Sequence, residues 1–489
     1  MPRRAASLPL VLPPRQAGLP AYRWLYAAIR SQIIGGRLSA GLRLPATRDL
    51  ARQFGLARGT VVTAFELLQA EGYVETGAGS GTFVASVTPL SSPRRGSHGT
   101  GGAPPPVLVR HLSKAARQVS PFPQHARASA RAFRANQPAL DLFPAAAWAR
   151  VASRCLRRAS PDLLGGCDPM GFPPLRAAIA EYLGMSRGVT CTPAQVAIVS
   201  GTQEALALAA TLVVNAGDTA FVEDPGYTGA VKLLETRGAR LRSVAIDGEG
   251  AVVPSTREPA RLAYLTPAHQ FPLATCMTMA RRLQWLAWAR TTGALLFEDD
   301  YDSEFRYSGR PVGALQGLDR DGLVLFAGSF SKVLCPALRL GYLVVPDDLI
   351  DRVSALVSVT SRHASGLMQA VLADFMALGH FTRHLRCMRD EYGERHDALL
   401  AGATRWLAGR LDVAPVEAGL QTVGYPLAGT PVRDLIAAAA TRDVEIVALS
   451  RFARSPIRRD GALLGFAAVP TAEIARGLQG LAKAFDRVR

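Results

Sequence analysis

The chain has 489 residues, of which 48% are hydrophobic, so it can form two or three domains with sizeable cores. No stretch holds 18 uncharged apolar residues in a row, and no signal-peptide pattern follows the first residues, so we expect a cytoplasmic protein without a membrane partner. The six cysteines are scattered without a C-x-x-C pair, which argues against a zinc site and a disulfide framework, and no metal is expected.

The net charge of +17 is concentrated at the N-terminal end of the chain. Residues 1–125 hold 15 Lys and Arg against 4 Asp and Glu, an excess of +11, and the remaining 364 residues carry +6. A basic excess at one end predicts a polyanionic partner, such as double-stranded DNA, for that end.

A first folded unit is predicted within residues 15–87 from apolar residues at helical spacing, followed by a hairpin pattern. The expected elements are a helix over 22–34, a helix with Thr47 as its N-cap, a helix over 58–70, and strands at 73–75 and 82–84 around a glycine-rich tip. The second and third helices are joined by a short glycine turn, which is the geometry that places a recognition helix in the major groove of DNA.

This unit resembles the winged helix-turn-helix domain of the GntR family of regulators. Three phrases carry the resemblance: GRLSAGLRLPATRDLA (36–51), RGTVVTAFELLQAEGY (58–73) and GSGTFV (79–84). The resemblance implies that DNA is contacted by Arg43, Arg48, Arg58, Thr60, Ser80 and Gly81. Ala57 departs from the pattern, because the family usually has a serine there, and this implies a weaker helix cap or phosphate contact.

Residues 88–125 are rich in proline, glycine and arginine and show no pattern that could bury a core, which predicts a linker. From 126 to 489 the pattern changes to strands that alternate with helices. Strands are predicted at 196–200, 219–222, 262–265, 294–297, 323–326 and 338–345, and helices at 202–213 and 278–291. This order predicts an α/β domain with a largely parallel sheet, whose large part spans about 166–350 and whose small part is built from both ends.

Lys332 directly follows one of these strands and is one of only four lysines in the chain. Taken alone, a surface lysine at a strand end is the simpler interpretation. However, ligands of parallel sheets bind at the carboxyl ends of strands, and a desolvated lysine there can form a Schiff base with a carbonyl cofactor such as pyridoxal 5'-phosphate. The other strand ends carry residues that suit the same cofactor: a helix start at 200–203 for its phosphate, Tyr227 for its ring, and the acidic run 298–300 for its pyridine nitrogen.

These strand ends resemble the fold-type-I, aspartate-aminotransferase-like family, and the order of the two units resembles the MocR-like branch of GntR regulators. The phrases that carry this resemblance are VEDPGYTGA (222–230), YLTPAHQFPL (264–273), EDDYDSEFRY (298–307), GSFSKVLCPALRLGY (328–342) and GHFTRHLRCMRDEY (379–392). The resemblance therefore implies pyridoxal 5'-phosphate as cofactor.

The resemblance also implies a role for each candidate residue. Lys332 would form the Schiff base, Asp299 would pair with the pyridine nitrogen, Tyr301 and His269 would lie near the ring oxygen, Tyr227 would stack on the ring, Thr202, Gln203, Ser329 and Arg339 would hold the phosphate, and Arg451 would bind an effector carboxylate. Two positions depart from the pattern. Gly166 replaces a tyrosine that reaches the neighbouring subunit's cofactor phosphate, and the turn at 273–275 lacks its usual glycine.

Three functions remain open from the sequence. The first is a transcription regulator whose aminotransferase-like domain senses pyridoxal phosphate or an amine, the second is a working aminotransferase that carries a DNA-binding arm, and the third is a repressor whose second domain only dimerises. The resemblance implies a head-to-tail homodimer on paired DNA half-sites. It associates the branch with vitamin B6, gamma-aminobutyrate or taurine, and Gly229 favours a B6 or other amine signal, because some gamma-aminobutyrate responders carry an arginine there.

Overall fold

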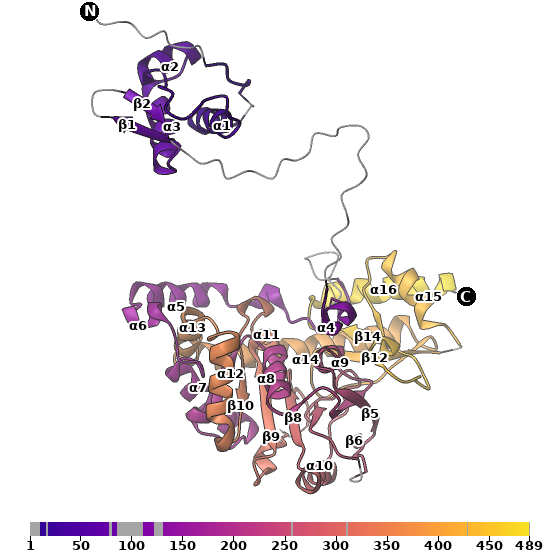
Figure 1. Cartoon of the computed structure of the whole chain (residues 1–489). Helices are drawn as coiled ribbons and strands as arrows, with labels where there is room; N and C mark the ends of the chain where they lie inside the picture. Colours follow the sequence, from indigo (N-terminus) through magenta and orange to yellow (C-terminus); the bar gives the residue numbers. More distant parts are fainter. Residues whose placement is uncertain are drawn as a thin grey trace, which may run out of the picture. The chain divides into compact units, whose positions relative to one another are not determined.

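The computed structural model describes residues 10–15, 18–77, 81–85, 111–121, 131–255, 258–309, 312–427 and 429–488. The chain divides into two compact units, residues 1–109 and 110–489, which are drawn in Figure 1. No helix within the described ranges is both long and apolar enough to cross a membrane.

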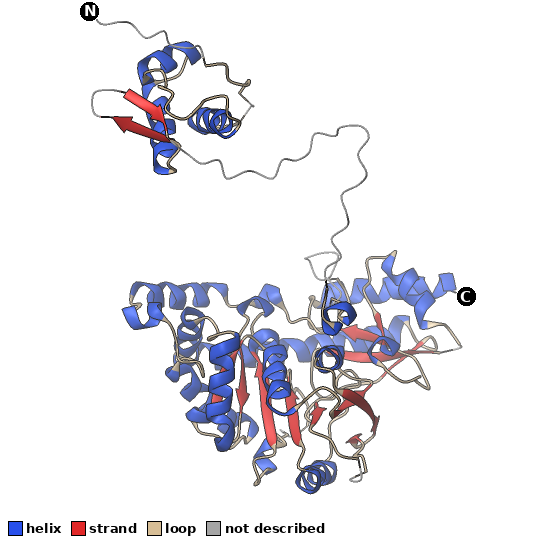
Figure 2. Cartoon of the chain, viewed as in Figure 1, coloured by secondary structure: helices blue, strands red, loops and turns tan. Residues whose placement is uncertain are grey.

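The first unit consists of three helices and a two-stranded hairpin (Figure 2). Its elements are α1 (Ala21–Ile34), α2 (Thr47–Phe54), α3 (Arg58–Ala70), β1 (Val74–Gly77) and β2 (Gly81–Val84). Helices α1 and α2 both pack on α3, and fully buried Leu25, Val61 and Leu68 lie in the core between them. The predicted helix-turn-helix and hairpin are therefore present, with α3 beginning and ending where the apolar spacing indicated.

The helix starts in this unit lack side-chain caps. The prediction that Thr47 is the N-cap of α2 is wrong: Ala46 occupies that position, and no side chain accepts a hydrogen bond from the first turn. Extended backbone at Ala46 (φ −59°, ψ 148°) places Thr47 inside the helix, where its hydroxyl is not in a capping position. Ala57 is the N-cap of α3, also without a side-chain bond, so the missing serine does leave that end uncapped.

The second unit is built on an eight-stranded sheet with the order β3-β10-β9-β8-β7-β4-β5-β6. These strands are β3 (Val196–Val199), β4 (Thr219–Asp224), β5 (Arg240–Asp247), β6 (Gly250–Ala251), β7 (Leu262–Leu265), β8 (Leu295–Asp300), β9 (Val324–Ser329) and β10 (Gly341–Val344). The run β9-β8-β7-β4-β5 is parallel, whereas β10 pairs antiparallel with both β3 and β9, and β6 pairs antiparallel with β5. The largely parallel sheet is thus confirmed, with antiparallel strands at its two sides.

Helices cover both faces of this sheet, so its central strands are buried on both sides. In β3, Ala197 and Val199 belong to one apolar cluster and Val196 and Ile198 to another, as the two-residue period of a strand requires. The helices of the unit are α4 (Lys114–Gln118), α5 (Ala145–Arg157), α6 (Pro161–Gly165), α7 (Pro173–Arg187), α8 (Thr202–Val213), α9 (Thr228–Thr236), α10 (Met279–Thr292), α11 (Phe330–Val333), α12 (Ile350–Thr360), α13 (Gly366–Ala377), α14 (His380–Trp406), α15 (Val432–Ala440) and α16 (Thr471–Val488).

A smaller antiparallel sheet forms the C-terminal part of this unit, with the order β11-β12-β14-β13. Its strands are β11 (Leu411–Val413), β12 (Gln421–Pro426), β13 (Val447–Ala448) and β14 (Ala462–Gly465). Isolated bridges join Ala132 to Val444 and Phe133 to Gly465. Residues 132 and 133, which precede the large sheet in the chain, therefore lie with the C-terminal part of the unit.

The predicted linker contains one described segment, residues 111–121. Within it, α4 begins after Ser113, whose side chain accepts a hydrogen bond from the amide of Ala116 at 3.1 Å, and the helix packs against α9. The rest of the stretch from 86 to 125 lies outside the described residues.

The turn between β7 and α10 carries a residue in an unfavourable backbone conformation. The amide of Gln270 donates to the carbonyl of Thr275 at 2.9 Å, and this turn holds Ala274 at a φ of 63°. Left-handed backbone costs an L-residue such as alanine roughly 1–2 kcal/mol, a cost that glycine does not carry.

Replacing Ala274 with glycine is therefore expected to stabilise the second unit. We expect Ala274→Gly to raise the free energy of unfolding by roughly 0.5–1 kcal/mol in urea denaturation, after the entropy that glycine adds to the unfolded chain is subtracted. The matched control is Ala287→Gly on the exposed face of α10, which should lower the same quantity by about 1 kcal/mol. Equal losses in both variants would contradict the strain at Ala274.

Candidate functional site

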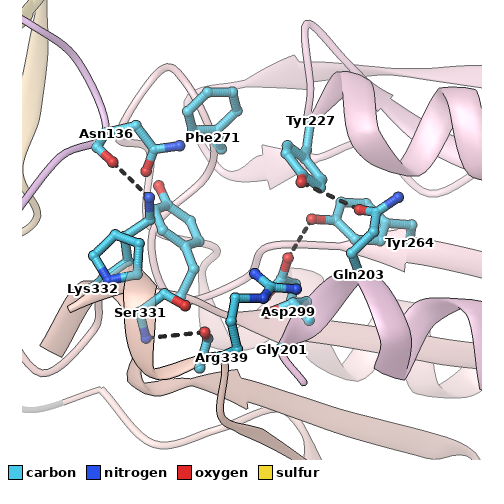
Figure 3. Close-up of a pocket in the computed structure, with 14 residues that line it drawn as sticks. Asn136, Gly201, Gln203, Tyr227, Tyr264, Phe271, Asp299, Ser331, Lys332 and Arg339 are labelled. Carbon is cyan, nitrogen blue, oxygen red and sulfur yellow. Dashed lines mark hydrogen bonds between the residues drawn. The ribbon is translucent and has the colours of Figure 1, made fainter. Parts of the chain in front are cut away.

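A cavity of about 230 Å³ opens at the carboxyl ends of the parallel strands in the second unit (Figure 3). Of the residues predicted to hold a cofactor, eight line it: Thr202, Gln203, Tyr227, Asp299, Tyr301, Ser329, Lys332 and Arg339. These residues follow or end four strands that are far apart in sequence. The fold therefore brings most of the predicted set together.

Lys332 lies on the short helix α11, immediately after β9. Its Nζ donates a hydrogen bond to the backbone carbonyl of Asn136 at 2.5 Å, and Figure 3 shows the amine directed to that oxygen. Burial lowers the pKa of the Lys332 amine to about 8, although the carboxylates of Asp302 and Asp299 oppose this shift. At pH 7 about one amine in ten is then neutral, compared with fewer than about one in a thousand for an ordinary lysine.

The two carboxylate oxygens of Asp299 differ in their hydrogen bonding. Its Oδ2 accepts a hydrogen bond from the Tyr264 hydroxyl at 2.5 Å, whereas its Oδ1 is buried and has no hydrogen-bond partner within the described part of the chain. Burial raises the pKa of Asp299 to about 7. A buried acceptor without a partner is costly, so this carboxylate fits a ligand that brings a cationic N–H donor.

The part of the cavity around Gly201 and Arg339 has the features of an anion site. Helix α8 begins after Gly201, whose φ of 126° requires glycine, and a side chain at that position would lie 3.8 Å from the Arg339 guanidinium. The free amides of a helix N-terminus attract anions, and Arg339 adds a full positive charge. Ser329 uses its hydroxyl to accept from the amide of Ser331 at 3.2 Å, at the start of α11. A phosphate group fits these donors.

Tyr227 forms one wall of the cavity and is fixed from behind. Its hydroxyl donates to Oε1 of Gln203 at 3.2 Å, and Nε2 of Gln203 donates to the carbonyl of Gly229 at 3.0 Å. Burial raises the pKa of Tyr227 to about 12. A Cβ at Gly229 would lie 2.3 Å from the Tyr227 ring, so the ring packs directly on the first turn of α9. Glycine at 229 thus has a packing reason independent of the effector.

His269 lies behind Tyr301 and does not line the cavity. Its Nδ1 is 2.8 Å from Oδ1 of Asp302 and 3.1 Å from the Tyr301 hydroxyl, and His269 and Asp302 are both buried. Burial holds the pKa of the Tyr301 phenol well above its usual range. Tyr301 therefore presents a protonated hydroxyl to the cavity, and His269 can act on a ring oxygen only through it.

Arg451 and Gly166, two positions that the sequence singled out, are not among the residues that line the cavity. Arg451 is exposed on a short 3-10 helix, Leu449–Phe452. The residue after it, Phe452, packs on Phe271, which lines the cavity. Gly166 is exposed at the end of α6 with φ 152° and ψ −170°. The roles inferred for these two positions therefore stay predictions.

In the first unit, most of the residues predicted to contact DNA lie on α2, on α3 or beside the hairpin, and they are at least partly exposed. Arg48 on α2 and Arg58 at the start of α3 are exposed, and Thr60 is partly exposed in the first turn of α3. Arg43 is exposed and bridges to Phe83 of the hairpin, and a Cβ at Gly81 would lie 2.8 Å from its guanidinium. Ser80 lies outside the described residues.

Comparison with known proteins assigns both units to families. Residues 21–84 match the bacterial regulatory proteins of the gntR family, and residues 132–426 match the class I and II aminotransferases. The probable rhizopine catabolism regulatory protein MocR of Rhizobium meliloti is 41% identical over 96% of this chain and 95% of its own length. The chain belongs to the MocR-type GntR regulators.

Two further relatives extend this assignment. The HTH-type pyridoxine biosynthesis transcriptional regulator PdxR of Corynebacterium glutamicum is 30% identical over 94% of this chain and 95% of its own. Among solved structures, the alpha-aminoadipate aminotransferase LysN of Thermus thermophilus, complexed with N-(5'-phosphopyridoxyl)-L-leucine, is 26% identical with a TM-score of 0.67, covering 73% of this chain and 92% of that one. This MocR-type chain is thus a DNA-binding transcription regulator whose second unit has the fold of pyridoxal-phosphate-dependent aminotransferases.

Six residues that line the cavity of the MocR-type site were not among the predicted site residues: Asn136, Gly201, Tyr264, Phe271, Ser331 and Pro336. Asn136 meets Lys332 through its backbone carbonyl, from a segment 196 positions earlier in the chain, so no side-chain pattern announces this contact. Phe271 lies in the quoted phrase 264–273 but is apolar, as core residues usually are. Tyr264 could have been found, because its hydroxyl sits inside an otherwise apolar strand and must have a buried partner.

The low pKa of Lys332 predicts its reactivity. Because only the neutral amine reacts, acylation of Lys332 by trace acetic anhydride should rise with pH and reach half of its maximum near pH 8, as followed by peptide mass spectrometry. A lysine in an unstructured reference peptide should reach half of its maximum near pH 10.4. A midpoint for Lys332 at or above the midpoint of the peptide would contradict the burial of Lys332 among apolar groups.

Proposed function

We propose that the second unit binds pyridoxal 5'-phosphate through Lys332, and that the cofactor or an amine captured on it controls DNA binding by the first unit. The observation that carries this proposal is the unpartnered buried oxygen of Asp299, which shares one cavity with the weakly basic Lys332. A group with a cationic ring nitrogen, an aldehyde and a phosphate would satisfy Asp299, Lys332 and the donors near Arg339 at once.

Each residue of the cavity would then have a distinct task. When bound, pyridoxal phosphate supplies an aldehyde that condenses with primary amines. Asp299 would hold a proton on the ring nitrogen, because a cationic N–H beside it would favour the carboxylate form that burial alone disfavours. Tyr301 would donate its hydroxyl hydrogen to the ring oxygen, Tyr227 would stack on the ring, and Thr202, Gln203, Ser329 and Arg339 would orient the phosphate.

The effector that we propose is pyridoxal phosphate itself or a small amine. The printed name of the Corynebacterium relative refers to pyridoxine biosynthesis, which supports the first choice. We also propose that the regulator acts as a head-to-tail homodimer on paired half-sites, because two-fold symmetric proteins present two recognition helices.

Aminotransferase activity is the second candidate function. In its favour, the cavity combines Lys332, Asp299 and Tyr301, which catalysis would also require. Against it, Arg339 is the single arginine that lines the cavity within the described ranges, and the phosphate would occupy it, whereas Arg451, the arginine predicted to bind a carboxylate, is not among the lining residues. A steady-state assay with common amino donors and keto acids decides between the two, and the regulator proposal expects no sustained turnover.

Removal of the Lys332 amine should abolish the covalent attachment of the cofactor. Wild-type protein incubated with pyridoxal phosphate and freed of excess should keep the visible absorbance band of a Schiff base, and Lys332→Ala should lose it. Lys483→Ala, which removes an exposed lysine of α16, is the matched control and should keep the band. An unchanged band in Lys332→Ala would refute the site assignment.

Arg58 should contribute to DNA affinity through a phosphate. We expect Arg58→Ala to weaken operator binding about tenfold at low salt and to reduce the slope of log affinity against log salt by about one. Exposed Arg23 on α1 provides the control, and Arg23→Ala should change neither quantity. Fluorescence anisotropy at several salt concentrations measures both, and identical slopes for Arg58→Ala and wild type would remove Arg58 from the interface.

A further inference from the structure

Residues 111–121, which we name the anchor segment, lie in sequence between the DNA-binding unit and the rest of the second unit. The segment is fastened to α9 by Lys232. The Nζ of Lys232 donates to the carbonyl of Ser120 at 3.2 Å, to its hydroxyl at 3.0 Å and to the carbonyl of Pro121 at 3.2 Å. Lys232, one of only four lysines in the chain, thus attaches to α9 a segment that follows the DNA-binding unit in sequence.

The anchor segment is held at its end rather than embedded in a core. Its apolar residues Leu112 and Val119 are each 54% exposed. A cavity of about 1030 Å³ is lined by Ala115 and Val119 of the anchor segment and by residues of α9, including Val231 and Thr228. With little apolar area buried, the attachment depends on polar contacts such as those of Lys232, and such segments open at low free energy.

Helix α9 connects this attachment to the cofactor cavity. Tyr227, which lines the cavity, is the N-cap residue of α9, and its ring would touch any Cβ at Gly229 in the first helical turn. Gln203, at the start of α8, also bonds to the carbonyl of Gly229. A ligand that displaces Tyr227 or Gln203 would therefore disturb the contacts of the first turn of α9, and Lys232 lies three residues after Gly229 in the same helix.

We propose that Lys232 and the anchor segment form a releasable latch, through which the state of the Tyr227 wall sets how the DNA-binding unit is tethered. This inference rests on the proposed function, because it requires a ligand in the cavity. The anchor segment would exchange between an attached and a released state. A ligand in the cavity would shift this equilibrium by the difference between its binding free energies for the two positions of α9.

The latch can be tested by proteolysis of the full-length protein. Trypsin should cleave the bond after Arg117 about tenfold faster in Lys232→Met than in wild type, because cleavage follows the population of the released segment. Ser120→Ala, which removes one of the three acceptors, should increase the rate about threefold. Lys483→Met on α16 is the matched control and should leave the rate unchanged. Equal cleavage of Lys232→Met and Lys483→Met would overturn the attachment.

Coupling to DNA is measured on the same three proteins. The ratio of operator affinities with and without pyridoxal phosphate should differ from one in wild type and in Lys483→Met, and should approach one in Lys232→Met, while all three keep the same cofactor absorbance. A wild-type ratio retained by Lys232→Met would overturn the proposal even if cleavage is faster. Absence of cofactor absorbance in wild type would instead defeat the proposed function, and the cleavage contrast would still report on the attachment.

Discussion

Desolvation of ionisable groups at one edge of a parallel sheet is the constraint on which this molecule depends. Burial lowers the pKa of Lys332 to about 8 and raises the pKa of Glu223, Glu298 and Asp299 each to about 7. Glu223 and Glu298 are satisfied by protein donors: Glu223 accepts from Thr266 and Gln270, and Glu298 accepts from the amides of Leu315 and Gln316. Asp299 alone among these three keeps a buried oxygen without a partner in the described structure.

These shifts act on stability with opposite signs. For Lys332 the unfolded chain binds more protons between about pH 8 and 10.5, so its contribution to the free energy of unfolding rises with pH in that window. For the three acids the folded chain binds more protons between about pH 4 and 7, so their contribution falls as pH rises there. Near neutral pH these buried groups therefore all oppose folding, Lys332 as a cation and the three acids as carboxylates. The proposed cofactor would offset this, because it would take up the Lys332 charge and give Asp299 a cationic partner.

The elements that the sequence predicts well are those with a strong local signal. Helices 58–70 and 202–213 and strand 262–265 begin and end where apolar period and glycine placement indicated, since their neighbours in sequence are also the groups that decide their ends. Prediction failed where a contact with a residue distant in sequence determines the local structure. Strand β5 was not predicted, because Arg240 and Arg242 interrupt any apolar run and its pairing with β4 is what orders it. The contact between Asn136 and Lys332 exists only in the fold.

The backbone at Gly166 has a consequence for any substitution at this position. Its angles, φ 152° and ψ −170°, fall in a region that is essentially accessible to glycine alone. A tyrosine placed there would first need its peptide planes rotated, which moves the end of α6 as well as the side chain. Restoring the tyrosine of the family pattern would therefore need accompanying changes in the neighbouring backbone, and a single substitution would not be enough.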